Sequence, residues 1–290
     1  CGATISWAFE CFEQGVLTAE DTGGLVLSYG DAGAMVALLE KILNRDGIGD
    51  VLAEGSAKAA DHLGKGHEYL LTVKGQELPA HMPHVKRSLV VVYATNPFGA
   101  DHQSSEHDPL YHPKPYEGSP EAPGYKVFLN QIGLDRPQPT KVLNEEKIEY
   151  ALKTQYNYSA MDTLGLCQFV YGPAWQLYGP QDQADLLAAA TGWPVTVADV
   201  QLLGQRRLNL MRALNAREGL ARDKDTLPKK LFTKPLSGGR SDGIVLDQVE
   251  LDAGLEMYYR QAGWSKETGV PTRQTLEDLG LSWAADDLGL

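Results

Sequence analysis

The chain has 290 residues, of which 43% are hydrophobic and 22% charged, and its formal net charge is −12. This composition is typical of a globular protein with one large or two medium domains. The acidic balance argues against nucleic acid as a partner, because phosphate binding needs concentrated Lys and Arg. No apolar run approaches the roughly 18 residues that suggest a membrane span, so we expect no membrane partner either.

Three cysteines, Cys1, Cys11 and Cys167, are too few and too widely spaced for a disulfide framework. They indicate a reducing compartment, and we expect the cytoplasm. The chain begins at Cys1, without methionine, and enters a helical pattern almost at once. We therefore expect it to be a fragment of a longer protein.

The first part of the chain shows three helical patterns, each followed by a glycine stop. Residues 4–15 have apolar side chains at helical spacing and end at Gly15. Asp31 is placed to cap a helix over residues 32–44, and a third helix is expected from about residue 50 to residue 63, closed by Gly64. These patterns predict a helical unit over residues 1–75.

The character of the sequence changes after residue 66. Residues 67–73 are β-prone, and the prolines Pro79 and Pro83 cannot continue a helix. We place a domain boundary between residues 74 and 83. This assigns residues 1–75 to the remainder of one helical domain and residues 76–290 to another.

A stretch rich in proline, glycine and tyrosine lies between Asp108 and Pro139. It predicts an irregular excursion of the kind that forms binding lids or partner contacts. Tyr111, Tyr116 and Tyr125 are candidates for the mouth of a pocket, with packing at the surface as the alternative.

Helical patterns resume after this stretch, at residues 144–160, 181–191, 197–217, 247–262 and 273–279. The pattern over residues 197–217 has an apolar stripe and a basic opposite face; the stripe is Val200, Leu203, Leu208, Met211 and Leu214. The fold class that we expect is therefore mainly α, with two helical domains and a few short strands.

Residues 162–168, DTLGLCQ, place a carboxylate, a glycine and a thiol within six residues, just after a helical pattern ends. A glycine lets backbone N–H groups approach a ligand closely. A carboxylate accepts hydrogen bonds from ring or amide N–H groups, and a thiolate binds soft metal centres. Taken alone, the segment is also typical of a cysteine buried in the core.

Seven segments that occur in a fixed order resemble the carboxyl-terminal two domains of the aldehyde:ferredoxin oxidoreductase family. They are residues 4–6, 47–55, 73–79, 93–102, 162–168, 217–228 and 269–272. Members of that family carry tungsten, or molybdenum, on two pterins beside a [4Fe–4S] cluster. The resemblance implies these cofactors, oxidation of a small aldehyde to a carboxylic acid, and ferredoxin as electron acceptor. It also implies that the amino-terminal domain is missing, and we expect a homodimer.

The resemblance assigns roles to individual residues. Cys167 matches the fourth cysteine of the family's iron–sulfur cluster, whose other three cysteines precede the part matched here. The residues that match the pterin-binding segment are Asp162, Thr163, Leu164, Gly165, Leu166, Cys167 and Gln168. Thr4 follows the remainder of a second pterin motif, in which Ala3 replaces the usual aspartate.

Two further residues stand near the implied metal. His102 matches a family histidine that contacts substrate, and histidine donates hydrogen bonds or moves protons near neutral pH; capping of the next helix is the alternative. Cys1 stands where the family commonly has glycine, so direct ligation of tungsten is a hypothesis, with a tolerated small residue as the alternative. Phe98 replaces the usual arginine before Gly-Ala-Asp, which predicts a different pocket polarity. Cys11 lies on an apolar helix face and is predicted to be core.

A basic series either pairs with neighbouring carboxylates or binds a pterin phosphate; it consists of Arg206, Arg207, Arg212, Arg217 and Arg222. His81 and His84 flank a proline turn, and His107 and His112 lie in the irregular stretch; neither pair is predicted to be functional. Two alternative functions stay open. One is the tungsten subunit of a benzoyl-CoA-reductase-like or other carbonyl or aromatic-ring oxidoreductase, and the other is a helical scaffold without cofactors.

Overall fold

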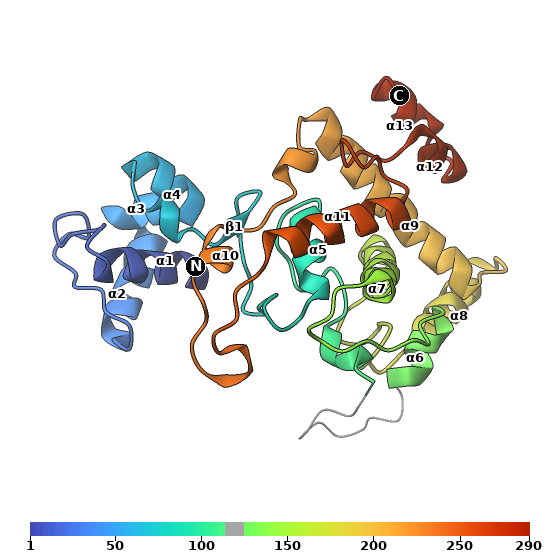
Figure 1. The fold of residues 1–290 in the computed structure, drawn as a ribbon, viewed down its shortest axis with the longest axis horizontal. Coiled ribbons are helices and arrows are strands. Elements are labelled where there is room, and N and C mark those ends of the chain that lie inside the picture. The colour runs from blue at the N-terminus through green and yellow to red at the C-terminus, as the bar shows by residue number, and fades with distance from the viewer. Residues whose placement is uncertain (114–124) are drawn as a thin grey trace.

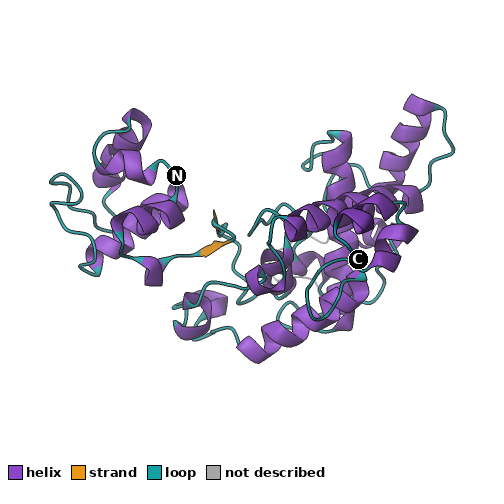
Figure 2. Ribbon diagram, turned by 90° about the horizontal axis from the view of Figure 1, so that it is seen from above, coloured by secondary structure: helices purple, strands orange, loops and turns teal. Residues whose placement is uncertain are grey.

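The computed structural model describes residues 1–113 and 125–290, and the regular secondary structure of this part is almost entirely helical (Figures 1 and 2). The first four helices are α1 (Gly2–Glu13), α2 (Ala32–Asn44), α3 (Ile48–Leu52) and α4 (Ser56–Leu63). The short strands β1 (Thr72–Val73) and β2 (Gln76–Glu77) follow and pair antiparallel. The expected fold class, mainly α with short strands, is confirmed.

The remaining helices form the second part of the chain. They are α5 (Ser88–Thr95), α6 (Tyr125–Gln131), α7 (Glu145–Leu164), α8 (Pro180–Thr191), α9 (Val197–Arg217), α10 (Lys230–Thr233), α11 (Gln248–Ala262), α12 (Arg273–Asp278) and α13 (Ser282–Asp287). Short 3₁₀ turns lie at His67–Tyr69, Asp108–Tyr111, Arg222–Lys224 and Gly239–Ser241. Within the described residues, no helix is both long and apolar enough to cross a membrane.

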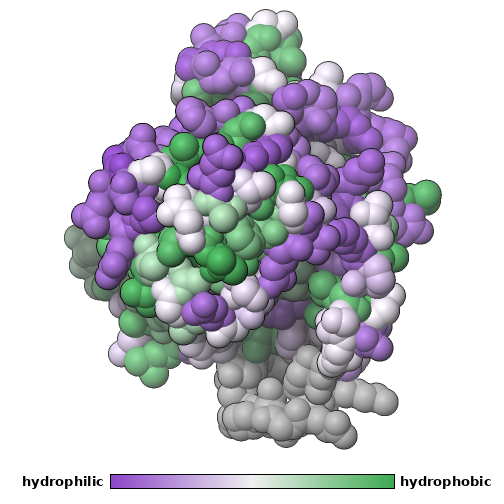
Figure 3. Space-filling model, turned by 90° about the vertical axis from the view of Figure 1, so that its left-hand side faces the viewer, coloured by the Kyte–Doolittle hydropathy of each residue, from purple (hydrophilic) through white to green (hydrophobic). Residues whose placement is uncertain are grey.

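Helices α1 to α4 enclose their own hydrophobic core, to which Trp7, Phe9 and Leu38 belong. The start of α2 is confirmed, since the Asp31 side chain accepts a hydrogen bond from the Ala34 N–H. The third predicted helix is wrong: Gly55, at φ 93°, separates α3 from α4. Hydrophobic side chains gather on the exposed face of this unit in Figure 3.

The hairpin of β1 and β2 lies between the α1–α4 unit and the rest of the molecule, as Figure 2 shows. Glu77 of this hairpin accepts hydrogen bonds from the Thr4 Oγ1 at 2.7 Å and from the Ser56 N–H at 3.0 Å. A second connection is the ion pair of Lys230 with Glu10, with an Nζ–Oε1 distance of 2.6 Å. These polar contacts hold the α1–α4 unit against the larger part.

The larger part surrounds α5, in which every residue is buried. This helix was not predicted, because apolar side chains on all its faces leave no helical period to detect. Helices α7 and α9 cross with their backbones in contact at Gly204. A Cβ atom there would lie 1.7 Å from the carbonyl oxygen of Tyr156, so only glycine permits this crossing.

Among the described residues, two ion pairs of this larger part have both side chains completely buried. Lys147 contacts Asp108 at 2.6 Å, and Arg212 forms a bidentate pair with Asp225. The predicted basic face of α9 is therefore wrong at Arg212, which the α9 backbone directs into the core toward Asp225. The predicted stripe is also wrong at its end, because Leu214 is exposed.

Several predicted boundaries are confirmed and others shift. The bounds of α9 match the prediction, and α7 continues four residues beyond it, to Leu164. The described residues of the irregular stretch include an α-helix, α6, that was not predicted. Tyr111 is not at a pocket mouth: it is buried and stacks on Tyr150 with ring centroids 4.6 Å apart. Tyr116 lies outside the described residues.

Candidate functional site

The segment with the carboxylate, glycine and thiol lies at the carboxyl end of α7. Asp162, Thr163 and Leu164 form the last turn of this helix rather than following it, so that part of the prediction is wrong. Gly165, at φ 68°, ends the helix in a left-handed conformation, and no atom lies within 4 Å of where its Cβ would be. The backbone is therefore open to an incoming group at this glycine.

The loop that follows presents unsatisfied groups at the surface. Cys167 is exposed and its thiol is unpaired, so the alternative of a buried core cysteine is wrong. Within the described residues, the N–H groups of Cys167, Gln168 and Phe169 donate to no acceptor. Three consecutive free donors beside an exposed thiol can bind an anionic or metal-bearing group.

Apolar side chains flank this loop. Phe169 is 65% exposed and Leu177 is 71% exposed. Trp175, also exposed, packs edge-on against Phe169, with ring centroids 5.8 Å apart. The segment that carries the thiol therefore also carries exposed apolar side chains, which are typical of a contact region.

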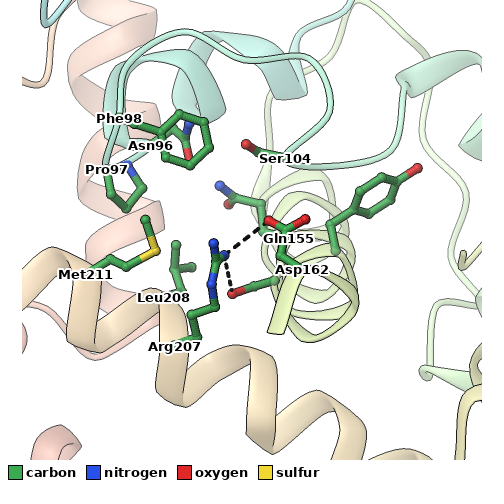
Figure 4. A pocket seen from close by; sticks show the side chains of 11 residues that line it. Asn96, Pro97, Phe98, Ser104, Gln155, Asp162, Arg207, Leu208 and Met211 are labelled. Atoms are coloured by element: carbon green, nitrogen blue, oxygen red, sulfur yellow. Dashed lines mark hydrogen bonds and ion pairs between the residues drawn. The ribbon is translucent and has the colours of Figure 1, made fainter. Parts of the chain in front are cut away.

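Asp162 links the loop to α9. Its carboxylate lies 3.2 Å from an Arg207 guanidinium nitrogen (Figure 4). It also accepts a hydrogen bond of 3.1 Å from the Gln168 side chain. Burial raises the pKa of Asp162 above its ordinary value, and Arg207 opposes that rise. The carboxylate is 38% exposed, so it retains room to accept a further donor.

The segment around His102 approaches the same place from another part of the chain. Asn96, Phe98 and Ser104 line one narrow pocket with Asp162 and Arg207 (Figure 4). Two of the segments singled out in the sequence, residues 93–102 and 162–168, therefore meet in the fold. Phe98 is exposed at this pocket, where an arginine was expected from the resemblance.

His102 is half-buried, and its two ring nitrogens differ in their surroundings. The Nε2 atom lies 3.1 Å from the side-chain nitrogen of Gln103. The Nδ1 atom is buried and has no hydrogen-bond partner among the described residues. A buried polar atom without a partner costs about 1–3 kcal/mol, so this nitrogen is suited to a polar group of a ligand.

Three side chains that were not predicted to be functional surround His102. The Lys86 Nζ lies 2.6 Å from His81 Nδ1 and 3.1 Å from His107 Nδ1. The His81 ring centroid lies 4.7 Å from that of His102 and 4.2 Å from that of His107. We call these four residues the Lys86 cluster. No sequence signal indicated it, because its members come from separate segments.

The amino-terminal candidates lie apart from this loop in the chain's fold. Cys1 is exposed and precedes α1, whereas Thr4 is buried and donates to Glu77. A cavity of about 430 Å³ lies beside them, lined by Ala3, Ser6, Trp7, Glu10, Ser56, Tyr69, Leu71, Glu77, Leu78, Pro79, Ala80 and Met82. Cys11 is buried in the core, as predicted, and burial raises the pKa of its thiol to about 12.

The arginine series forms ion pairs at three of its five positions: Arg207 with Asp162, Arg212 with Asp225, and Arg217 with Asp287. Arg206 donates to the Leu279 carbonyl oxygen. The Arg222 guanidinium lies over the Tyr259 ring, 5.3 Å from its centroid. The prediction that these arginines pair with neighbouring carboxylates is confirmed at Arg207, Arg212 and Arg217.

The comparison with known protein families gives one match over nearly the whole chain. Residues 1–281 match the family model described as aldehyde ferredoxin oxidoreductase, domains 2 and 3. The tungsten-containing aldehyde ferredoxin oxidoreductase of Pyrococcus abyssi is 33% identical over 285 residues, and that of Pyrococcus furiosus is 34% identical over 285 residues. Each alignment covers 97% of this chain and 42% of the relative.

More distant similarities involve other reactions. A WOR-like subunit of an aliphatic sulfonate oxidoreductase from Pyrococcus furiosus is 27% identical over 297 residues, covering 98% of this chain and 40% of the relative. Among solved structures, the active-site complex BamBC of benzoyl-coenzyme A reductase aligns with a TM-score of 0.71 at 24% identity. That alignment covers 98% of this chain and 44% of the solved chain, and it shows a shared fold.

Proposed function

We propose, on the premise that this chain belongs to the aldehyde ferredoxin oxidoreductase family, that it forms the carboxyl-terminal part of an enzyme that oxidises aldehydes. The chain spans 42% of the length of its relatives, so it supplies only part of such an enzyme. In the proposed reaction, an aldehyde and water give a carboxylic acid, two protons and two electrons. Two ferredoxin molecules each accept one electron.

The observation that carries this proposal is the exposed loop of Cys167, in which three N–H groups have no acceptor in the part of the chain that the structure describes. Its donor set suits the implied cofactors, tungsten (or molybdenum) on two pterins and a [4Fe–4S] cluster. Cys167 would supply one thiolate ligand of the cluster, and Asp162 would accept hydrogen bonds from pterin N–H groups. When bound, the metal and pterins supply the two-electron redox change, while the protein positions the substrate.

The other segments that match the pterin site have narrower roles. Thr163, Leu164, Gly165, Leu166 and Gln168 complete the loop that would contact one pterin. Thr4 would contribute from the second motif, through the same hydroxyl that now donates to Glu77. Direct ligation of tungsten by the exposed Cys1 remains a hypothesis.

His102 is the proposed catalytic residue. Its buried Nδ1 atom has no partner among the described residues, so it is suited to exchange a hydrogen bond with the substrate's carbonyl oxygen or with the attacking water. Gln103 would hold the ring through Nε2. In this role the imidazole orients the reacting oxygen and holds or releases a proton at Nδ1.

The organisation of the enzyme is part of the proposal. We propose a division at residue 75, between the end of one helical domain and a second helical domain, because two separate hydrophobic cores lie on either side of the hairpin. We also propose a ferredoxin partner and a homodimeric assembly. Three unpaired thiols suit the reducing cytoplasm, which is the compartment we propose.

The proposal is tested with the complete enzyme from the parent gene. Its tungsten, molybdenum and iron contents are measured, and dye reduction is assayed across small aldehydes. We expect stoichiometric metal, about four irons, and aldehyde-dependent reduction. The C167S variant should lose the cluster's electron paramagnetic resonance signal, whereas C11S should keep it, since Cys11 lies in the core.

The two alternatives predict different outcomes of the same experiment. A protein that contains the metal but reduces or oxidises only aromatic thioesters would favour a benzoyl-CoA-reductase-like function. The chain shares its fold with part of the solved benzoyl-coenzyme A reductase complex. A colourless protein without iron, tungsten or molybdenum would favour the scaffold and contradict the proposal.

A further inference from the structure

The Lys86 cluster gathers one ammonium group and three imidazoles in a half-buried position next to His102. The Lys86 Nζ donates to His81 Nδ1 at 2.6 Å and to His107 Nδ1 at 3.1 Å. His107 in turn directs its Nε2 at the His102 carbonyl oxygen, 3.1 Å away. Because Nδ1 accepts in both outer rings, the proton of each neutral ring lies on Nε2.

The positive charge of Lys86 has no hydrogen-bonded carboxylate among the described residues. The nearby Asp108 is committed to the Ser88 N–H and hydroxyl and to Lys147. Asp101, beside His102, accepts from the Gln103 N–H and the Ser104 hydroxyl. Among the described residues the Lys86 ammonium therefore has no carboxylate in direct contact; burial lowers its pKa, and the negative charge of Asp108 opposes that fall from a distance.

Glu106, the remaining carboxylate of this segment, is also engaged elsewhere. It is fully buried and accepts from the Tyr158 hydroxyl at 2.6 Å and from the Gln176 side chain at 2.8 Å. Burial raises the pKa of Glu106 above its ordinary value, so its environment disfavours a negative charge. It does not neutralise Lys86.

The cluster has donors left over. Lys86 has three N–H groups, and two of them are used within the described part of the chain. The His81 Nε2 has no acceptor there, and the His102 Nδ1 is buried without a partner. Burial, with the Lys86 charge, lowers the pKa of both His81 and His107 to about 4, which keeps these rings neutral near pH 7.

We propose that the Lys86 cluster binds the anionic oxygens of a substrate, so that the enzyme acts on short aldehydes that carry a carboxylate or phosphate group. Lys86 supplies the charge, and His81 supplies a neighbouring N–H donor. An ammonium and directed N–H groups form strong, charge-assisted hydrogen bonds to such oxygens. The His81 and His102 rings are 4.7 Å apart, so the anionic group must lie close to the aldehyde carbon.

This inference rests on the proposed function for its catalytic part, but the binding part is tested without turnover. Thermal unfolding of the complete enzyme is measured with acetate, with phosphate and with chloride at equal ionic strength. Acetate or phosphate should raise the melting temperature of the wild type above its value in chloride, since a ligand that binds only the folded state stabilises it. The absence of any such rise would overturn the proposal.

Variants assign the effect to this site. K86M and K86Q should lose the acetate- or phosphate-specific rise, whereas K58M, which removes an exposed lysine of α4, should retain it. Comparison of the melting temperatures in acetate and in phosphate shows whether the site prefers a carboxylate or a phosphate group. Equal rises in wild type, K86M and K86Q would place the anion elsewhere and contradict the proposal.

The catalytic arm compares matched aldehydes: succinate semialdehyde with butyraldehyde, and glycolaldehyde phosphate with glycolaldehyde. K86M should lower kcat/KM for the anionic member about 10- to 100-fold more than for the neutral member, the range of a hydrogen bond to a charged group. An equal loss of kcat/KM for the anionic and the neutral aldehyde would contradict a role of Lys86 in specificity. A protein that oxidises no aldehyde but keeps the Lys86-dependent anion stabilisation would contradict only the proposed function.

Discussion

The carboxylate of Asp162, at the end of α7, lies 3.2 Å from the guanidinium of Arg207, in the middle of α9. The same carboxylate accepts a hydrogen bond from Gln168, one residue beyond Cys167. The thiol-bearing loop is thus attached to the longest helix of the described fold through one side chain. Both partners are partly exposed, so this pair acts mainly by positioning the loop rather than by stabilising the fold.

Replacing Arg207 should therefore disturb the loop more than the fold. We expect R207M to lower the iron content of the complete enzyme several-fold and to change its free energy of unfolding by less than about 1 kcal/mol. Iron analysis and urea unfolding measure the two effects. R217M, which removes an exposed arginine at the end of the same helix, is the matched control and should keep its iron. Loss of iron in both variants would refute the positioning role.

The three thiols should react with iodoacetamide at very different rates. Burial raises the pKa of Cys11 to about 12, so at pH 8 only about 10⁻⁴ of that thiol is the reactive thiolate. Cys1 and Cys167 are exposed. We expect mass spectrometry of the cofactor-free protein to find label on Cys1 and Cys167 but on Cys11 only after denaturation. Rapid labelling of Cys11 in the folded protein would contradict the buried position.

Asp225 holds a buried network together. It accepts hydrogen bonds from Arg212 at 2.8 Å, from Lys74 at 3.0 Å and from the Tyr259 hydroxyl at 2.6 Å. Removing one member of a buried ion pair costs about 3–5 kcal/mol, because the remaining charges stay buried without compensation. D225N should show that loss in urea unfolding. D223N, two residues away and exposed, should change stability by less than about 0.5 kcal/mol.

Glu77 should make stability depend on pH in the acid range. Burial by itself raises the pKa of Glu77, but hydrogen bonds from Ser56 and Thr4 outweigh it, and the pKa falls below the ordinary 4.5. A carboxylate with a lowered pKa stabilises the fold above the unfolded value of 4.5, and that contribution is lost as pH falls through the folded pKa.

The stability difference between wild type and E77Q should therefore be largest near pH 7 and shrink below about pH 4.5. Urea unfolding at several pH values measures it. E20Q, a substitution at an exposed glutamate, serves as the matched control and should show a far smaller difference. A difference for E77Q that stayed constant from pH 7 to pH 3 would show that the carboxylate is not the titrating group.

Local signals explain which helices could be predicted from the sequence. Asp31 caps α2 and Thr196 caps α9 within their own segments, so both helices start where the sequence indicates. The break between α3 and α4 could not be predicted in the same way. It occurs where the Glu77 carboxylate, 21 residues away, binds the first N–H of α4. Helix α5 gave no signal, because its apolar residues face protein on every side.

In the candidate site, too, features within one segment could be predicted from the sequence, whereas contacts between distant segments could not. The exposed Cys167 loop lies within one segment, so its residue types could be recognised directly. His81, Lys86 and His107 come together only when the turn before α5 folds against the segment that follows it. None of the three carries a signal alone, and the contact of the Lys86 ammonium with two imidazoles became apparent only from the distances between them.

The backbone contact at Gly204 has a consequence for how this protein tolerates change. At this position α7 and α9 approach so closely that a Cβ atom would lie 1.7 Å from the Tyr156 carbonyl oxygen. Any side chain there would push the two helices apart. Asp162 lies on α7 and Arg207 on α9, so the distance between them depends on the glycine at position 204.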